Sequence, residues 1–252
     1  KYLRSGVMNK GLFEASEEGP PQGGPLSPLL SNIMLNELDK DLERRGLPFV
    51  RYADDSMIFC KSKRAAMRVK ESVPRFIENA LYLKVNKEKT VVSYVRGVKY
   101  LGYSFYVMKG KCQLTVHPKS KAKMKSRLKE LASRSNGWGY AKRKQMLKEY
   151  IRGWVGYYHL ANMKRLLLET DEWLRRRIRM CIWKAWKKVK TKVANLIRCG
   201  INKYKAYEWG NTRKGYWRIA DSYILHRAIT NEYLCRAGYA TLMGAYLEWH
   251  PK

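Results

Sequence analysis

The sequence predicts an α+β protein, in which a mixed part of helices and strands, residues 1–116, precedes an all-helical part, residues 117–252. Strand-like and helical segments alternate up to His117-Pro118, and only helical periodicity follows. All 8 tryptophans lie in the second part, which also carries most of the excess positive charge. A chain of 252 residues is long enough for two domains, so we place a domain boundary after residue 116.

In the first part, apolar residues recur at helical spacing from Leu26 to Leu42, which predicts a helix that ends before Gly46. Strand-like runs at 49–52 and 56–60 flank a short polar turn, which predicts a hairpin. The other predicted elements of this part are a helix at 63–82, interrupted at Pro74, and strands at 91–94, 100–107 and 113–116.

Composition narrows the class of function. The chain has 52 Lys and Arg against 21 Asp and Glu, which gives a net charge of +31. A protein this basic repels itself unless it binds a polyanion, and nucleic acid is the commonest one. This nearly excludes an enzyme that acts on small molecules without such a partner. The 5 cysteines show no C-x-x-C spacing, which argues against a zinc module and a disulfide framework.

Asp54 and Asp55 stand side by side at the apex of the predicted hairpin. Adjacent carboxylates suit Mg²⁺, which prefers one or two of them together with water and substrate phosphates. The alternative is an ordinary hairpin turn, because aspartate is favoured in turns for local reasons.

The segment from Gly19 to Pro28 is a loop rich in glycine and proline that leads directly into the first helix. Free backbone amides at such a helix start suit a phosphate, and glycine lets the backbone approach a flat base. The alternative is a simple lead-in to the helix.

Three segments in this order resemble the palm of reverse transcriptases: Gln22-Gly23-Gly24-Pro25-Leu26-Ser27-Pro28, Tyr52-Ala53-Asp54-Asp55 and Lys99-Tyr100-Leu101-Gly102-Tyr103. Segments 150–158 and 173–187 resemble the thumb and maturase domain of group II intron reverse transcriptases. The resemblance covers essentially the whole chain and is weak from about Lys203 onward. It implies the C-terminal half of a right-hand polymerase palm, residues 1–116, followed by an all-helical thumb and maturase domain, residues 117–252.

The resemblance implies an RNA-directed DNA polymerase of a group II intron, with a maturase role in intron RNA binding, splicing and retrohoming. Asp54 and Asp55 would be its catalytic, metal-binding carboxylates, with two Mg²⁺ ions in the complete enzyme. The implied substrate contacts are Tyr52, Gln22, Gly23, Gly24, Lys89, Tyr100, Leu101 and Gly102. Lys89 is equally well explained as a solvated lysine, and Gly102 by close backbone packing in a strand.

In this family another metal-binding aspartate lies upstream of the Gln-Gly-Gly loop, and only Lys1 to Glu18 precede that loop here. We therefore expect that this chain lacks the fingers and that aspartate, that it is inactive alone, and that an N-terminal segment or a partner chain completes the site. The implied partners are an RNA template and primer duplex, group II intron RNA, target DNA and deoxynucleoside triphosphates.

No apolar run approaches the roughly 20 residues of a membrane-spanning helix, so we expect no membrane partner. The expected location is the bacterial cytoplasm, with an organelle as the alternative.

A nucleic-acid surface is predicted on a helix from Trp173 to Lys190. At about 100° per residue its apolar side chains share one face. The opposite face carries Arg176, Arg179, Trp183, Lys187 and Lys190. An exposed Trp183 among cations would stack on a base, and the alternative is that Trp183 packs on another helix. Lys121 and Lys125 on a preceding helix are expected to face duplex phosphates.

Two other functions stay open. One is a non-catalytic RNA-binding splicing cofactor with a degenerate palm, against which the intact Tyr-Ala-Asp-Asp segment counts. The other is a reverse transcriptase of a defence or diversity-generating system. Segments 150–158 and 173–187 favour the intron family over this second alternative.

Overall fold

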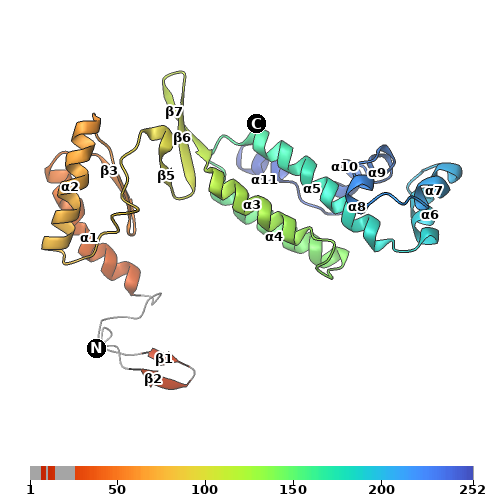
Figure 1. The fold of residues 1–252 in the computed structure, drawn as a ribbon, viewed down its shortest axis with the longest axis horizontal. Helices are drawn as coiled ribbons and strands as arrows, with labels where there is room; N and C mark the ends of the chain where they lie inside the picture. Colours follow the sequence, from red (N-terminus) through yellow and green to blue (C-terminus); the bar gives the residue numbers. More distant parts are fainter. Residues whose placement is uncertain (1–6, 10, 15–25, 252) are drawn as a thin grey trace. The chain divides into compact units, whose positions relative to one another are not determined.

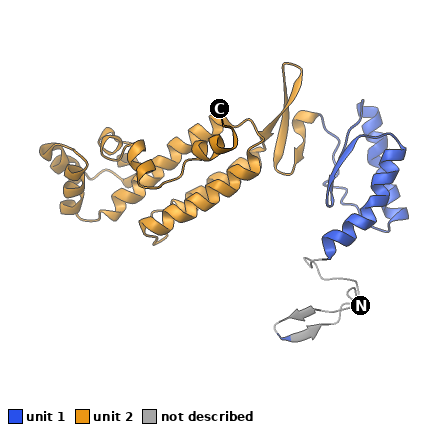
Figure 2. Cartoon of the chain, turned by 180° about the vertical axis from the view of Figure 1, so that it is seen from behind, with its two compact units in different colours: residues 1–94 blue, residues 95–252 orange. Residues whose placement is uncertain are grey.

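The structure, a computed structural model, describes residues 7–9, 11–14 and 26–251. The fold is α+β, and the chain forms two compact units, residues 1–94 and 95–252 (Figure 1, Figure 2). This division lies before the predicted boundary at residue 116, because the last three strands pack with the helices that follow them. Val116, at the end of these strands, is buried in the helical core.

The described residues of unit 1 form two helices and two short hairpins. Its elements are β1 (Val7–Asn9), β2 (Leu12–Glu14), α1 (Ser27–Arg44), β3 (Phe49–Tyr52), β4 (Asp55–Ile58) and α2 (Lys63–Ala80). β1 pairs with β2 and β3 with β4, both in antiparallel fashion. The loop with Gln22, Gly23 and Gly24 lies outside the described residues.

The core of unit 1 joins α1 to α2. Leu35, Leu38 and Leu42 follow one another at helical spacing on α1 and are buried in one cluster with Val73 and Leu81. The predicted first helix is therefore confirmed. It ends before Gly46, whose φ of +62° is favourable for glycine after a helix.

The second helix of unit 1 differs from the prediction at Pro74. α2 continues through this proline instead of being interrupted there. The proline removes one backbone donor. Burial of Val73, with partial burial of Phe76 and Ile77 against the same core, stabilises the turns on both sides. Ser62 caps the start of α2 by accepting a hydrogen bond from the Ala65 amide (3.2 Å).

Unit 2 begins with a three-stranded antiparallel sheet. A short 3₁₀ helix, η2 (Val95–Gly97), precedes β5 (Lys99–Tyr100), β6 (Tyr103–Met108) and β7 (Lys111–Val116), in the order β5-β6-β7. The strand predicted at 91–94 is wrong, since this segment is irregular and both Val91 and Tyr94 are exposed. Residues with a high strand propensity form a strand only where a neighbouring strand packs and pairs with them. The segment predicted as one strand at 100–107 is divided by a turn at Leu101–Gly102.

The rest of unit 2 is helical, as predicted. The helices are α3 (Pro118–Leu131), α4 (Tyr140–Tyr158), α5 (Lys164–Ala185), α6 (Val189–Arg198), α7 (Lys203–Gly210), α8 (Tyr216–Ile219), α9 (Tyr223–Ala228), α10 (Asn231–Arg236) and α11 (Leu242–Trp249). α3, α4 and α5 are the long helices of the unit, and α11 packs against α4 and α5 (Figure 1). None of the described helices is both long and apolar enough to cross a membrane.

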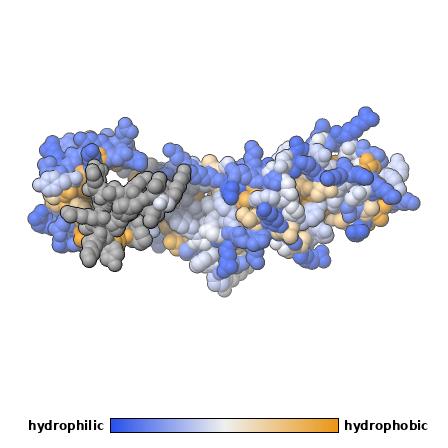
Figure 3. All heavy atoms as spheres, turned by 90° about the horizontal axis from the view of Figure 1, so that it is seen from below, coloured by the Kyte–Doolittle hydropathy of each residue, from blue (hydrophilic) through white to orange (hydrophobic). Residues whose placement is uncertain are grey.

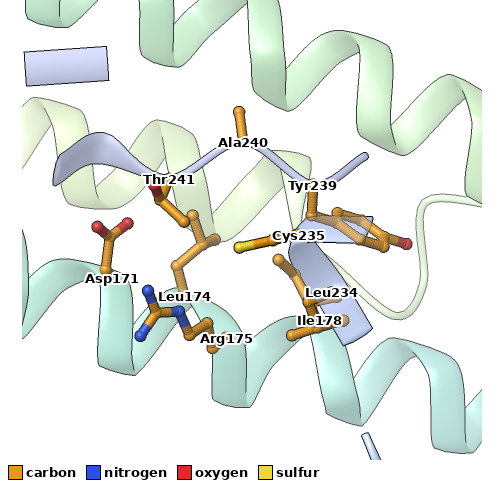
Figure 4. A pocket seen from close by; sticks show the side chains of 9 residues that line it. All are labelled: Asp171, Leu174, Arg175, Ile178, Leu234, Cys235, Tyr239, Ala240 and Thr241. Atoms are coloured by element: carbon orange, nitrogen blue, oxygen red, sulfur yellow. The ribbon is translucent and has the colours of Figure 1, made fainter. Parts of the chain in front are cut away.

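Asp171 joins α5 to the start of α11. Its buried carboxylate accepts hydrogen bonds from the backbone amides of Leu242 (2.8 Å) and Met243 (2.9 Å). Burial raises the pKa of Asp171, although these two bonds and Arg175 act in the opposite direction. Figure 4 shows Asp171 and Arg175 beside a cavity of about 10 Å³, which has room for about one water molecule.

We expect Asp171→Ala to lower the free energy of unfolding by about 2 kcal/mol, because two buried amides lose their acceptor. Asp171→Asn keeps one acceptor oxygen and removes the buried charge, so its loss should be smaller. Urea unfolding followed by circular dichroism measures both. Equal stability of Asp171→Ala and the unaltered chain would show that the α5–α11 contact does not depend on this carboxylate.

Candidate functional site

The β3–β4 hairpin carries the two aspartates of the Tyr-Ala-Asp-Asp segment. Tyr52 pairs with Asp55 across the strands, so Ala53 and Asp54 form a two-residue turn. The predicted hairpin is confirmed, with Asp55 as the first residue of β4. Tyr52, Asp54 and Asp55 are all exposed, and Tyr52 keeps 65% of its surface accessible.

The turn adopts a backbone conformation that is uncommon for alanine. Ala53 has a φ of +52°, in the left-handed region, which costs a residue with a side chain about 1 kcal/mol. A tight turn also interrupts the strict alternation of side-chain directions along a strand. Adjacent carboxylates at this place are therefore not forced onto opposite faces.

Asp54 and Asp55 are a donor set that fits Mg²⁺. This ion takes one or two carboxylates and keeps water or phosphate oxygens at its other positions. In the ranges 7–9, 11–14 and 26–251, no group of three or more His, Cys, Asp or Glu side chains is placed to hold a metal ion. Asp54 and Asp55 therefore supply two of the oxygen donors that Mg²⁺ accepts in combination with water and substrate phosphates.

The other predicted substrate contacts lie in separate segments. Lys89 is exposed in the loop after α2, where its backbone amide donates to the Asn86 side-chain oxygen (3.1 Å). Tyr100, Leu101 and Gly102 belong to unit 2. Their roles toward a substrate remain predictions.

Leu101 and Gly102 form the two-residue turn between β5 and β6. Their φ values of +48° and +81° are the combination that the tightest hairpin turns need. The Gly102 carbonyl accepts hydrogen bonds from the Ser120 hydroxyl (3.1 Å) and the His117 amide (3.0 Å). The Tyr157 hydroxyl donates to the Leu101 carbonyl (2.9 Å). The start of α3 and the end of α4 thus hold this turn.

Gly102 is required by packing as well as by backbone conformation. A Cβ atom added to Gly102 would overlap the hydroxyl oxygen of Tyr158. Close backbone packing at Gly102 is therefore confirmed, in a turn instead of the predicted strand.

An open cleft of about 350 Å³ lies beside the Leu101–Gly102 turn. Its lining consists of Lys99, Leu101, Gly102, Ser120, Lys123, Met124, Tyr150, Trp154, Tyr157 and Tyr158. Aromatic faces combined with ammonium groups suit a nucleic-acid strand. Sequence reasoning missed the aromatic residues as site candidates. Their spacing in the sequence could have identified them, because positions 150, 154, 157 and 158 share one side of a helix.

Four of the predicted nucleic-acid contacts reach the surface of unit 2, whose visible face is largely hydrophilic (Figure 3). Lys121, half-buried, and Lys125, exposed, lie one turn apart on α3. Lys187 and Lys190 are exposed but do not share a helix with Trp173 as predicted. α5 ends at Ala185, and Lys190 belongs to α6.

Two predicted contacts are wrong. Trp183 is only 1% exposed and lies in the core, and Arg179 is 3% exposed. The Arg179 guanidinium donates to the Ile229 carbonyl (2.9 Å) and to the Asn231 side-chain oxygen (2.9 Å). Residues after α7 cover Arg179, whereas the ammonium group of Lys192 on α6 lies over the Trp183 ring, 4.8 Å from its centre. Neither residue is therefore offered to nucleic acid.

Arg176 is also engaged within the fold. Its guanidinium lies 4.0 Å from the centre of the Trp217 ring and forms an ion pair with Asp221 (2.9 Å). It also donates to the Trp217 carbonyl (3.0 Å). These contacts attach α8 and the segment after it to α5.

A hairpin with two exposed, adjacent carboxylates, followed by a basic helical unit, is the arrangement expected of a polymerase palm and thumb. Residues 2–105 match the family model described as reverse transcriptase (RNA-dependent DNA polymerase). Residues 121–200 match the model described as the group II intron, maturase-specific domain. The two matches, in this order along one chain, support a group II intron reverse transcriptase and maturase as its family.

Three bacterial relatives are similar to parts of this chain. Protein YkfC of Escherichia coli strain K12 is 33% identical over 41% of this chain and 36% of its own length. The group II intron-encoded protein LtrA of Lactococcus lactis subsp. cremoris is 27% identical over 42% of this chain and 29% of its own length. The retron Ec86 reverse transcriptase of E. coli is 32% identical over 29% of this chain and 24% of its own length. The matched region thus spans about a quarter to a third of these relatives.

We expect Gly102→Ala to lower the free energy of unfolding by about 3 kcal/mol, because it adds an overlap with Tyr158 to a left-handed backbone. Gly110→Ala is the matched control. Gly110 holds the same position in the β6–β7 turn, at a φ of +74°, and a Cβ atom added there would have nothing within 4 Å. Its loss should be about 1 kcal/mol. Similar urea midpoints for the two variants would contradict the packing role of Gly102.

Proposed function

We propose that this chain is the palm and thumb part of a group II intron reverse transcriptase, which copies RNA into DNA and binds intron RNA as a maturase. The observation that best supports this is the exposed Asp54–Asp55 pair on its hairpin, inside the reverse-transcriptase match and before the maturase match. Its substrates would be an RNA template and primer duplex and deoxynucleoside triphosphates. Its further partners would be group II intron RNA and target DNA, in the cytoplasm of a bacterium.

The proposed chemistry is nucleotidyl transfer. Asp54 and Asp55 would hold Mg²⁺, which when bound activates the primer hydroxyl and stabilises the leaving pyrophosphate. Tyr52, exposed beside them, would support the end of the primer or the incoming nucleotide. Gln22, Gly23 and Gly24 would border the nucleotide and template.

The remaining proposed contacts would neutralise negative charge on the substrates or touch the primer. Lys89 would offset the negative charge of the triphosphate. The turn of Tyr100, Leu101 and Gly102 would contact the primer, with the aromatic cleft beside it. Lys121, Lys125, Lys187 and Lys190 would bind phosphates, which positions a nucleic acid without reading its sequence.

A second candidate is an RNA-binding splicing cofactor without polymerase activity. The observation that favours it is that the maturase match lies wholly in unit 2, whose core is separate from the aspartate hairpin. RNA binding by unit 2 would then not depend on Asp54 or Asp55.

Primer extension on an RNA template separates the two candidates. It is measured with Mg²⁺ and deoxynucleotides, using the chain and also the chain joined to any polypeptide encoded directly upstream of Lys1. In the form that extends primers, we expect Asp54→Asn to reduce the rate by at least about 100-fold. Glu71→Gln, which removes an exposed carboxylate from α2, should leave the rate unchanged.

Full-rate extension by Asp54→Asn would contradict the metal-binding assignment. Specific binding of intron RNA with no extension in either form would favour the splicing cofactor.

RNA binding should weaken steeply with salt, by roughly 0.7 to 0.9 log units in affinity per log unit of salt for each neutralised phosphate. The double variant Lys121→Ala/Lys125→Ala should reduce this slope by up to about 1.5. The matched control is Lys63→Ala/Lys70→Ala, which removes two exposed lysines from α2 and should leave the slope unchanged. Filter binding at several salt concentrations measures the slopes, and a flat response of the unaltered chain would contradict an electrostatic RNA surface.

A further inference from the structure

Arg51 connects the aspartate turn to the first helix of unit 1. It lies on β3, two residues before Ala53. Its Nε donates to the Asp39 carboxylate (2.8 Å). One terminal nitrogen donates both to the Asn32 side-chain oxygen (2.8 Å) and to the Ala53 carbonyl (3.1 Å). Since Asn32 and Asp39 belong to α1, a single side chain ties the turn to that helix.

The Arg51–Asp39 pair is shielded from solvent. The two side chains are 12% and 20% exposed, whereas those of the pair Lys40–Glu37 on α1 are 61% and 57% exposed. Asp39 accepts from both Nε and the second terminal nitrogen of Arg51. A planar guanidinium that is held through two of its nitrogens by one carboxylate has a fixed orientation. Its bond to the Ala53 carbonyl therefore has a fixed direction.

The Ala53 carbonyl determines how the chain enters Asp54. The carbonyl of residue 53 and the amide of residue 54 lie in one rigid peptide plane. A hydrogen bond to that oxygen therefore restrains rotation of the plane that carries Asp54. The restraint matters because the left-handed φ of Ala53 persists only where surrounding groups hold it.

We propose that Arg51 is a positioning residue, whose guanidinium holds the Ala53–Asp54 peptide in the conformation that directs the Asp54 and Asp55 carboxylates toward a shared divalent cation. This inference rests on the proposed function, which assigns the cation to these two carboxylates. The negative charge of Asp39 balances the positive charge of Arg51. The Arg51 guanidinium therefore holds the turn without adding a net positive charge near the proposed metal site.

Charge and geometry predict opposite effects of removing Arg51. A nearby positive charge repels Mg²⁺, so loss of that charge alone would strengthen binding of a divalent cation. Loss of a group that orients metal ligands weakens binding, by roughly 10-fold or more. Arg51→Met thus distinguishes the two effects by the sign of the change. Arg51→Lys keeps the charge but cannot bond Asp39 and Ala53 as a fork, so it tests geometry alone.

The control is Arg45→Met. Arg45 lies in the same unit and forms an ion pair with Asp41 (3.2 Å) and a hydrogen bond with the Ser72 hydroxyl (2.6 Å). Its removal takes away the same charge and a comparable link between elements, while leaving the bonds of Arg51 in place.

The experiment follows backbone amide signals of the isotope-labelled full chain by NMR. Mn²⁺, in competition with Mg²⁺, broadens the signals of residues near a bound ion, and amide hydrogen exchange reports the order of the turn. We expect Arg51→Met and Arg51→Lys to speed exchange at residues 53–55 and to weaken Mn²⁺ binding at Asp54 and Asp55 roughly 10-fold. Arg45→Met should match the unaltered chain in both measurements.

Unchanged exchange and Mn²⁺ binding in both Arg51 variants would overturn the inference. Tighter Mn²⁺ binding by Arg51→Met, with no effect of Arg51→Lys, would overturn it in favour of a purely electrostatic role. If the unaltered chain shows no Mn²⁺ effect at Asp54 and Asp55, the proposed metal site fails. In that case the hydrogen-exchange rates at residues 53–55 still show whether Arg51 orders the turn. If Arg51→Met does not fold, the exchange rates of Arg51→Lys answer the same question.

Discussion

The burial of α5 is the constraint on which unit 2 depends. α3, α8 and α11 all contact this helix, and its buried residues include Asp171 and Arg179 as well as apolar side chains. Buried polar groups must find partners inside the protein. Asp171 finds them at the start of α11, and Arg179 finds them at Ile229 and Asn231. The segment after residue 200 therefore completes the apolar core around α5 and also supplies the hydrogen-bond partners of its buried polar side chains.

The sequence was sufficient for features that arise from local periodicity. Apolar spacing predicted the first helix and the helical character of the second part, and alternation around a polar turn predicted the aspartate hairpin. It was insufficient where exposure depends on distant segments. Trp183 and Arg179 lie on the polar side of an isolated α5, yet both are buried. Arg179 bonds to the Ile229 carbonyl, 50 positions later in the chain, and Lys192 of the next helix lies over the Trp183 ring.

Turns were the second source of error. The division of the 100–107 segment at Leu101–Gly102 is stabilised by Ser120 and Tyr157, neither of which is near in sequence. The aromatic cleft beside it likewise combines strand, turn and helix residues, so spacing on α4 alone did not identify it. For the aspartates, by contrast, sequence order and local turn preference were enough to place both residues on a hairpin.

Both turns proposed to contact substrate share one physical design. Each holds a residue with a side chain in the left-handed region, Ala53 in one and Leu101 in the other. In each, a side chain from the packed framework donates to a turn carbonyl, Arg51 in unit 1 and Tyr157 in unit 2. Loops that are bonded in this way lose little further freedom when a ligand binds, which favours affinity and accurate placement.

The Asp171 contact also has a consequence for the timing of folding during synthesis. Its amide partners follow it by 71 and 72 residues. A ribosome adds about 5–20 residues per second, so α5 waits roughly 4 to 14 s before α11 has been made. During that interval the apolar surfaces of α4 and α5 that α11 later covers stay open to other chains. A nascent unit 2 should therefore depend on a chaperone, or on early binding of the proposed RNA partner, more than its finished core suggests.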